Sequence, residues 1–188
     1  MAGSDTTANS IRLTLLALLT TPSALSRLQS EITHAISHNL ISSPISNSEA
    51  LSLPYLQAVI YEGIRLYPPT NSTFDKQVPP GGVTLHNYYL PEGTQLLNNT
   101  IHMMHSTEIF GPDADLFRPE RWIDMAESDP TRHKEWIGIV DLVFGYGKYV
   151  CLGKALAMME LNKVFVEVSS SCLGRRDFRM RGLTESSC

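Results

Sequence analysis

Apolar residues at helical spacing mark three segments in the first part of the chain. An apolar run spans residues 11–19 and is ended by Pro22. Ser23 can cap the helix that follows, and the apolar stripe of that helix consists of Leu25, Leu28, Ile32 and Ile36. After a loop rich in serine and proline, a further helix is predicted over residues 53–67, where two prolines stop it.

The pattern changes from helical to strand-like between residues 71 and 99. Turn signals at residues 79–82 (Pro-Pro-Gly-Gly) and 91–93 (Pro-Glu-Gly) flank short apolar pieces at 83–90 and 94–97, which predicts a small, hairpin-rich sheet. Residues 124–136 are polar and are predicted to be irregular. A last helix is expected to end at residue 168, and residues 169–188 are expected to form a disordered tail. The fold class is therefore mainly α with a small β-sheet.

Composition and charge argue against several classes of function. The chain has 188 residues and a net charge of −4, which gives no electrostatic case for a nucleic-acid partner. Three cysteines without a Cys-x-x-Cys pair indicate neither a zinc site nor a disulfide framework. The first 26 residues have some features of a signal peptide, and a secreted binding domain would carry glycans at Asn71 or Asn98. Asp5 and the odd number of cysteines argue against secretion.

The turn around Cys151 carries the strongest chemical signal. It reads Phe-Gly-Tyr-Gly-Lys-Tyr-Val-Cys-Leu-Gly over residues 144–153, directly before a helical pattern. Glycines allow the backbone to turn tightly and to approach a flat surface. A cysteine near a helix N-terminus has its thiolate stabilised, which suits donation to a haem iron. A small buried thiol is the commoner interpretation of such a stretch taken alone.

Three weaker motifs precede this turn. Asp5 and Thr6 place an acid beside an alcohol, which can pass protons or simply cap a helix. Glu62 and Arg65 are three residues apart on one helix face, where an ordinary surface ion pair is the default interpretation. Residues 117–122 read Phe-Arg-Pro-Glu-Arg-Trp and include Arg121.

In their shared order these four motifs closely resemble the C-terminal part of the cytochrome P450 family, the haem-thiolate monooxygenases, and are similar to fungal members. The resemblance covers residues 1–168, which would form the C-terminal portion of a cytochrome P450 domain. It implies haem b as cofactor, with the Cys151 thiolate as the axial ligand of the iron. Phe144 would pack beside this ligand, and Gly147 and Gly153 would allow close approach to the porphyrin.

The resemblance also implies a role for each of the remaining motifs. Asp5 and Thr6 match the acid–alcohol pair that delivers protons so that the O–O bond breaks. A buried network is implied for Glu62, Arg65 and Arg121. Tyr149 stands where the family usually has a basic residue that pairs with a haem propionate, and Lys76 stands where it usually has a propionate-binding arginine. Lysine offers a point charge without the bidentate fork of arginine.

The family reaction inserts one oxygen atom from O2 into a small organic substrate, with electrons from an NADPH-dependent reductase. Full-length members of this type are expected at the cytosolic face of the endoplasmic reticulum membrane. The anchor lies outside this sequence, so we expect the present chain to be cytoplasmic. The alternative is a truncated, non-catalytic fragment that binds haem weakly or not at all, with residues 169–188 unlike the family's usual ending.

Overall fold

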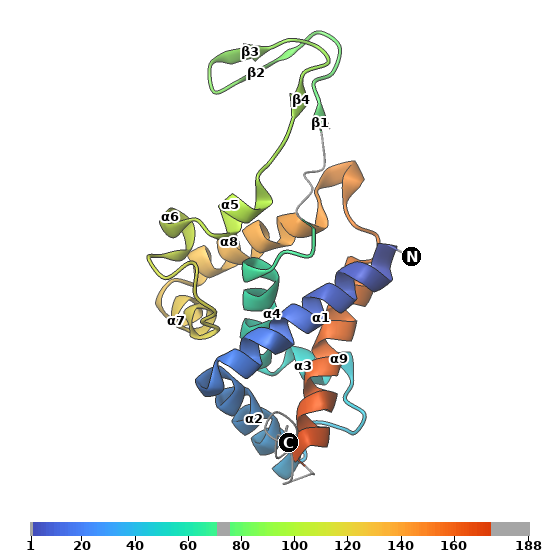
Figure 1. The fold of residues 1–188 in the computed structure, drawn as a ribbon, viewed down its shortest axis with the longest axis vertical. Coiled ribbons are helices and arrows are strands. Elements are labelled where there is room, and N and C mark those ends of the chain that lie inside the picture. The colour runs from blue at the N-terminus through green and yellow to red at the C-terminus, as the bar shows by residue number, and fades with distance from the viewer. Residues whose placement is uncertain (1, 71–75, 174–188) are drawn as a thin grey trace, which may run out of the picture.

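The computed structural model describes residues 2–70 and 76–173. Figure 1 shows a body of packed helices from which a slender arm, formed by residues 76–96, projects away. The arm contains two separate two-stranded sheets, and the body contains the helices. The predicted class, mainly α with a small β component, is confirmed. Among the described residues, the structure contains no helix with the length and apolar character needed to cross a membrane.

Two helices form the first part of the body: α1 (Ala2–Thr20) and α2 (Pro22–Ser37). Pro22 occupies the first turn of α2, where its missing N–H costs nothing, and Thr21 is the N-cap residue. The prediction that Ser23 caps this helix is therefore wrong. The buried face of α2 consists of Ala24, Leu28, Ile32 and Ala35, whereas Ile36 from the predicted stripe is 46% exposed.

The central helix of the body is α4 (Pro54–Leu66), which follows the short helix α3 (Asn47–Leu51). It packs against α1, α2, α7, α8 and α9, and most of its side chains are buried. The close packing of α1 requires a glycine at position 63 of this helix. A Cβ atom at Gly63 would lie 2.0 Å from Thr14 Oγ1 of α1 and would overlap it. The helix predicted over residues 53–67 is confirmed to within one residue at each end.

The arm begins and ends in one antiparallel pair, β1 (Lys76–Gln77) with β4 (Gln95–Leu96). Between them lies a hairpin of β2 (Val83–Leu85) and β3 (Tyr88–Leu90). The two residues of its turn, His86 and Asn87, have φ values of 46° and 69°, as in the tight turns that match strand twist. The piece predicted at residues 83–90 is thus a hairpin and not a single strand.

The segment after the arm is more helical than predicted. It contains α5 (Thr100–Met104), α6 (Thr107–Phe110), α7 (Glu120–Ser128) and α8 (Pro130–Asp141). The prediction that residues 124–136 are irregular is wrong. Asp129 ends one helix and caps the next, since its carboxylate accepts the backbone N–H groups of Thr131 and Arg132.

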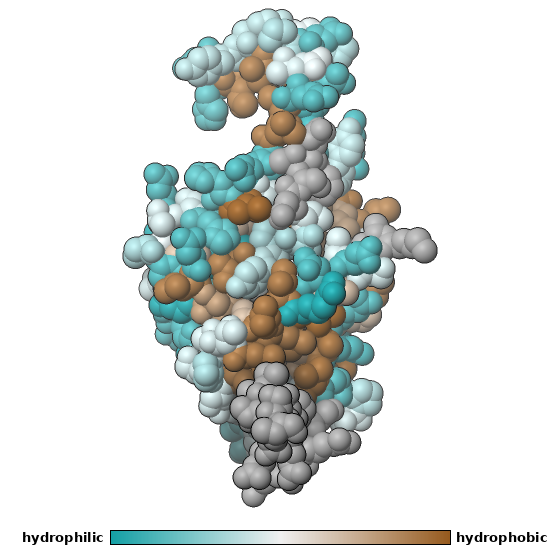
Figure 2. Space-filling model, in the orientation of Figure 1, coloured by the Kyte–Doolittle hydropathy of each residue, from teal (hydrophilic) through white to brown (hydrophobic). Residues whose placement is uncertain are grey.

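Two short 3-10 turns, η1 (Leu142–Phe144) and η2 (Gly147–Tyr149), lead into the last helix, α9 (Lys154–Leu173). Helix α9 continues past residue 168, so the first residues of the expected tail are helical. Residues 174–188 lie outside the part of the chain that the structure describes. Figure 2 shows apolar surface gathered over the lower half of the body in this view. Large exposed apolar side chains include Leu16 and Leu19 of α1 and Leu156 of α9.

Candidate cofactor site

A cavity of about 530 Å³ lies between the N-terminal half of α1 and the beginning of α9. Thr6 and Ile11 of α1 form part of one wall, and Phe144, Cys151 and Gly153 form part of another. In Figure 1 the two helices lie against each other near the N-terminus of the chain. The cavity therefore brings Thr6, from the first motif, together with the cysteine turn, which is far from it in the sequence.

Cys151 is a free, exposed thiol on this wall. Its backbone N–H donates to the carbonyl oxygen of Phe144 at 2.6 Å, which closes the loop, and its own carbonyl accepts the N–H of Lys154 at 3.3 Å. The helix α9 begins three residues after the cysteine, so the thiol lies near the end where backbone N–H groups are unpaired. Phe144 is mostly buried and supports the loop from within.

The glycines of the loop differ in what they contribute. Gly145 has a φ of 79°, and a Cβ atom there would lie 2.5 Å from the carbonyl oxygen of Tyr149. Gly147 has a φ of 62° but faces open space. A Cβ atom at Gly153 would meet Cys151 Sγ at an ordinary 3.8 Å, so this glycine keeps the cavity wall flat beside the thiol. Gly145 was not singled out from the sequence, although it stands within the quoted motif.

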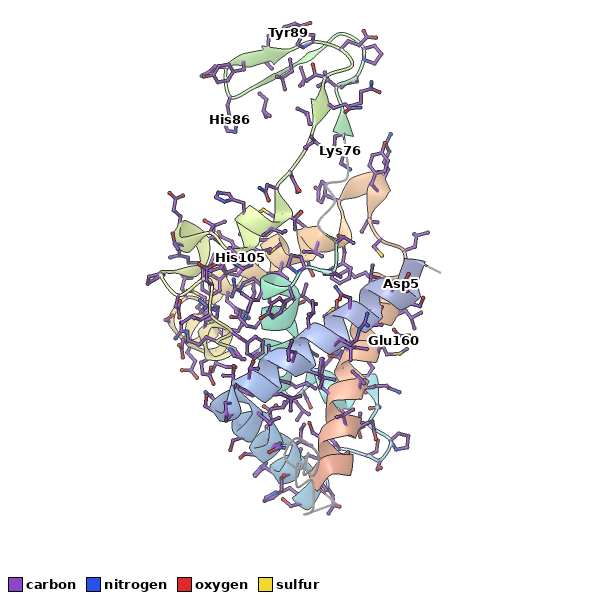
Figure 3. The ribbon with its side chains drawn as sticks, viewed as in Figure 1. Asp5, Lys76, His86, Tyr89, His105 and Glu160 are labelled. Atoms are coloured by element: carbon purple, nitrogen blue, oxygen red, sulfur yellow. The ribbon has the colours of Figure 1, made fainter. Side chains whose placement is uncertain are left out.

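The acid and the alcohol on α1 face different surroundings. Thr6 is half-buried and lines the cavity, whereas Asp5 is exposed and lies outside its lining. Consecutive helical residues point about 100° apart, which accounts for the difference. Glu160 on α9 also lines the cavity, and sequence reasoning missed it. Figure 3 shows Asp5 and Glu160 near the same end of these two helices.

The structure brings Glu62, Arg65 and Arg121 together in the interior of the helical body. Their exposed fractions are 0%, 0% and 1%. Arg65 donates from Nε and Nη2 to the two carboxylate oxygens of Glu62 at 2.8 and 2.9 Å. Arg121 Nε donates to Glu62 Oε1 at 2.9 Å. The default interpretation of Glu62 and Arg65 as a surface ion pair is therefore wrong.

Further donors and acceptors complete this network. The indole N–H of Trp122 and the backbone N–H of Arg118 each donate to Glu62 at 2.9 Å. Arg121 also bonds Asp113 Oδ1 at 2.9 Å. Burial opposes ionisation of Asp113, but the hydrogen bond and charge of Arg121, with the charge of Arg118, hold its pKa below the usual value. Sequence reasoning missed Asp113 and Trp122, although Trp122 stands at the end of the quoted motif.

Lys76 and Tyr149 lie together at the base of the arm. The Lys76 ammonium lies 3.8 Å from the centroid of the Tyr149 ring, and the Lys148 ammonium lies 4.9 Å from it. Figure 3 shows Lys76 where the arm meets the body. Neither Lys76 nor Tyr149 lines the cavity. Of the two predicted glycosylation sites, Asn71 lies outside the described residues, and Asn98 is exposed and accepts a hydrogen bond from Thr100 at 2.9 Å.

The site fits a haem better than a bare metal ion. Within residues 2–70 and 76–173, no group of three His, Cys, Asp or Glu side chains is arranged to hold a metal. The cavity instead offers one exposed thiol on a largely apolar wall that includes Ile11, Phe144 and Leu156. A porphyrin supplies the equatorial ligands of its iron, so that a single protein thiolate is enough.

Comparison with known proteins places the chain. It matches the family model Cytochrome P450 over residues 1–170. It is 45% identical over 168 residues to the cytochrome P450 monooxygenase aba1 of Botryotinia fuckeliana. These residues cover 89% of this chain and 32% of that protein. It is 42% identical over 181 residues to the cytochrome P450 monooxygenase ABA1 of Pyricularia oryzae, covering 96% and 34%.

A more distant relative is the cytochrome P450 monooxygenase ACRTS1 of Alternaria alternata, 36% identical over 168 residues that cover 89% of this chain and 44% of that protein. The chain spans about a third of the first two relatives. All three relatives are fungal proteins and carry the same family name. With the family model matched over most of its length, the chain belongs to the cytochrome P450 family.

Proposed function

We propose that this chain forms the haem-binding part of a monooxygenase that inserts one oxygen atom from O2 into a small organic substrate. The electrons come from an NADPH-dependent reductase. The observation that carries the proposal is the cavity shared by the Cys151 thiol and the Thr6 side chain. A ligand for the iron and a hydroxyl able to handle protons meet there, in a chain whose relatives are named monooxygenases.

In this proposal the Cys151 thiolate would hold the iron of haem b. Its loop is closed by the hydrogen bond to Phe144, and Gly153 keeps the wall beside the thiol free of side-chain bulk. When bound, haem supplies the redox chemistry that activates O2, while the protein supplies the ligand, protons and the shape of the pocket. The apolar side chains of Ile11 and Leu156 line the cavity and favour an apolar substrate.

Asp5 and Thr6 form the proton path. Asp5 is exposed to solvent, and the next residue, Thr6, lines the cavity. Because the two side chains point about 100° apart, Asp5 would supply protons on the solvent side of α1, and the Thr6 hydroxyl would give up its own proton in the cavity as it accepts another. The adjacent positions on one helix thus link solvent with a largely apolar site.

Lys76 and Tyr149, which lie at the base of the arm and outside the cavity lining, would bind the haem propionates. Lys76 brings the positive charge, and the Tyr149 hydroxyl can donate one hydrogen bond. The contact between the Lys76 ammonium and the Tyr149 ring, at 3.8 Å from its centroid, keeps both groups at the base of the arm.

The absorption spectrum of the reduced, carbon-monoxide-treated protein tests the proposal. The full chain, expressed with haem available, is expected to give the red-shifted Soret band of thiolate ligation. Cys151→Ser removes the only thiol that lines the described cavity and should abolish this band. Cys172→Ser is the control and should leave it intact.

Two outcomes would contradict the proposal. If both cysteine variants behaved alike, Cys151 would not be the ligand. If soluble, folded wild-type protein gave no thiolate band, the chain would bind haem weakly or not at all, and the alternative of a non-catalytic fragment would hold.

A further inference from the structure

One ion pair closes the base of the cysteine loop. Asp141 is the last residue of α8 and Lys154 is the first residue of α9, so they bracket the segment that carries Cys151. Asp141 Oδ2 and Lys154 Nζ are 2.8 Å apart, and their side chains are 28% and 34% exposed. The pair therefore joins the two ends of the loop at a half-buried position.

Lys154 also contacts the loop on both sides of the cysteine. Its ammonium lies 5.4 Å from the centroid of the Phe144 ring, and its backbone N–H donates to the Cys151 carbonyl at 3.3 Å. The carbonyl of Phe144 in turn accepts the Cys151 N–H at 2.6 Å. Lys154 therefore contacts both residues that form the hydrogen bond closing the loop, Phe144 through its side chain and Cys151 through its backbone.

The carboxylate of Asp141 has one oxygen in the ion pair and one without a hydrogen-bond partner among the described residues. Among the described residues, Asp141 Oδ1 is buried and has no hydrogen-bond partner. A buried acceptor without a partner is unfavourable for stability and calls for another explanation. The charge of Asp141 acts on its surroundings, because burial first and then this carboxylate raise the pKa of Tyr61 to about 12.

We propose that Asp141 and Lys154 are positioning residues that hold the Cys151 loop and balance the charge around its thiolate. The inference rests on the proposed function, in which Cys151 is the iron ligand. A nearby ammonium favours the more negative, reduced state of the site, and a nearby carboxylate disfavours it. In the ion pair the two influences oppose each other, and the ammonium lies over the Phe144 ring.

The reduction potential of the haem-loaded full chain tests the charge balance. Asp141→Asn leaves an uncompensated ammonium and should raise the potential. Lys154→Met leaves an uncompensated carboxylate and should lower it, whereas the double variant should return close to wild type. Lys154→Arg keeps the charge and should also stay close to wild type. Asp124→Asn, which removes an exposed partner of Arg118, is the control and should cause no shift.

A merely structural role would give a different pattern. Both single variants would then shift the potential in the same direction, and the double variant would be at least as perturbed as either. That result, or an absence of any shift in a protein that shows the thiolate band, overturns the inference.

Backbone hydrogen exchange tests the loop without haem. In the folded chain, Asp141→Asn and Lys154→Met should speed exchange of the Cys151 amide several-fold, because its acceptor Phe144 is no longer held. Lys154→Arg should leave the exchange unchanged. Unchanged exchange in both single variants would also overturn the inference. Failure of wild-type protein to show the thiolate band would refute the proposed function, while this measurement would still decide whether the pair positions the loop.

Discussion

Among single residues, Gly145 determines whether the cysteine loop can close. Its φ of 79° lies in the region that favours glycine, and its Cα faces the Tyr149 carbonyl so closely that a Cβ atom would overlap it. The loop returns there so that the Cys151 N–H can reach Phe144. A side chain at this position would open the turn that presents the thiol.

Gly145→Ala and Gly138→Ala form a matched pair. Gly138 lies within α8 and a Cβ atom there would meet nothing within 4 Å, so alanine should stabilise the protein by about 0.5–1 kcal/mol. Gly145→Ala should instead destabilise it by about 1–3 kcal/mol. Urea unfolding measures both free energies. Equal effects at the two positions would show that the loop geometry is not constrained as described.

At the scale of elements, helix ends depend on side chains that satisfy backbone groups. The start of α3 is a capping box, in which Glu49 N–H donates to Ser46 Oγ at 3.3 Å and Ser46 N–H donates to Glu49 Oε2 at 2.8 Å. The Ser42 hydroxyl also donates to Glu49 at 2.8 Å. The hydrogen bonds from Ser46 and Ser42 lower the pKa of Glu49 from 4.5 to about 2.

This capping box predicts a pH dependence. Because the pKa of Glu49 is lower in the folded chain, its contribution to stability is complete above pH 4.5 and is lost as the pH falls through about 2. The stability difference between wild type and Glu49→Gln should therefore shrink over this range. Thermal unfolding between pH 2 and 6 measures the difference, and NMR titration of the Glu49 carboxyl gives its pKa. A Glu49 midpoint near 4.5, or a difference that does not change with pH, would contradict the prediction.

At the scale of the whole molecule, Glu62 connects α4 to the chain that follows the arm. It accepts from Arg65 on its own helix and from Arg118, Arg121 and Trp122 at the start of α7. Arg65 Nη1 extends the connection to the carbonyls of Met104 and Ala114 at 2.6 and 2.7 Å. The network thus holds together segments that the arm separates in sequence.

Glu62→Gln should be strongly destabilising. It leaves the buried Arg65 without a carboxylate partner and Arg121 with Asp113 alone, and breaking a buried ion pair costs about 3–5 kcal/mol. Asp124→Asn breaks an exposed pair with Arg118 and should cost less than about 1 kcal/mol. Denaturant unfolding compares the two variants. A small loss for Glu62→Gln would show that the network does not support the fold.

Local spacing was enough to predict the elements whose signals lie close together in the chain. The prolines around α4 act on their immediate neighbours, and this helix was confirmed to within one residue at each end. The turn signals at residues 79–82 and 91–93 indicated short strands, but the turn of the hairpin itself, at His86 and Asn87, was not predicted. The helix α8 was missed because its exposed face is polar, and only packing shows that Trp136 and Val140 are buried. Amphipathic patterns are weak when few apolar positions interrupt a polar run.

For the candidate site, the sequence by itself determined which residue types are present and which lie on one helix. The three-residue spacing places Glu62 and Arg65 on one face, and the order of motifs identified the cysteine turn. Only the tertiary structure decided that Thr6 faces the cavity while Asp5 faces solvent, and that Asp113 joins Arg121. The reason is physical: backbone geometry sets neighbours within a few residues, whereas burial and long-range contacts depend on how the helices pack.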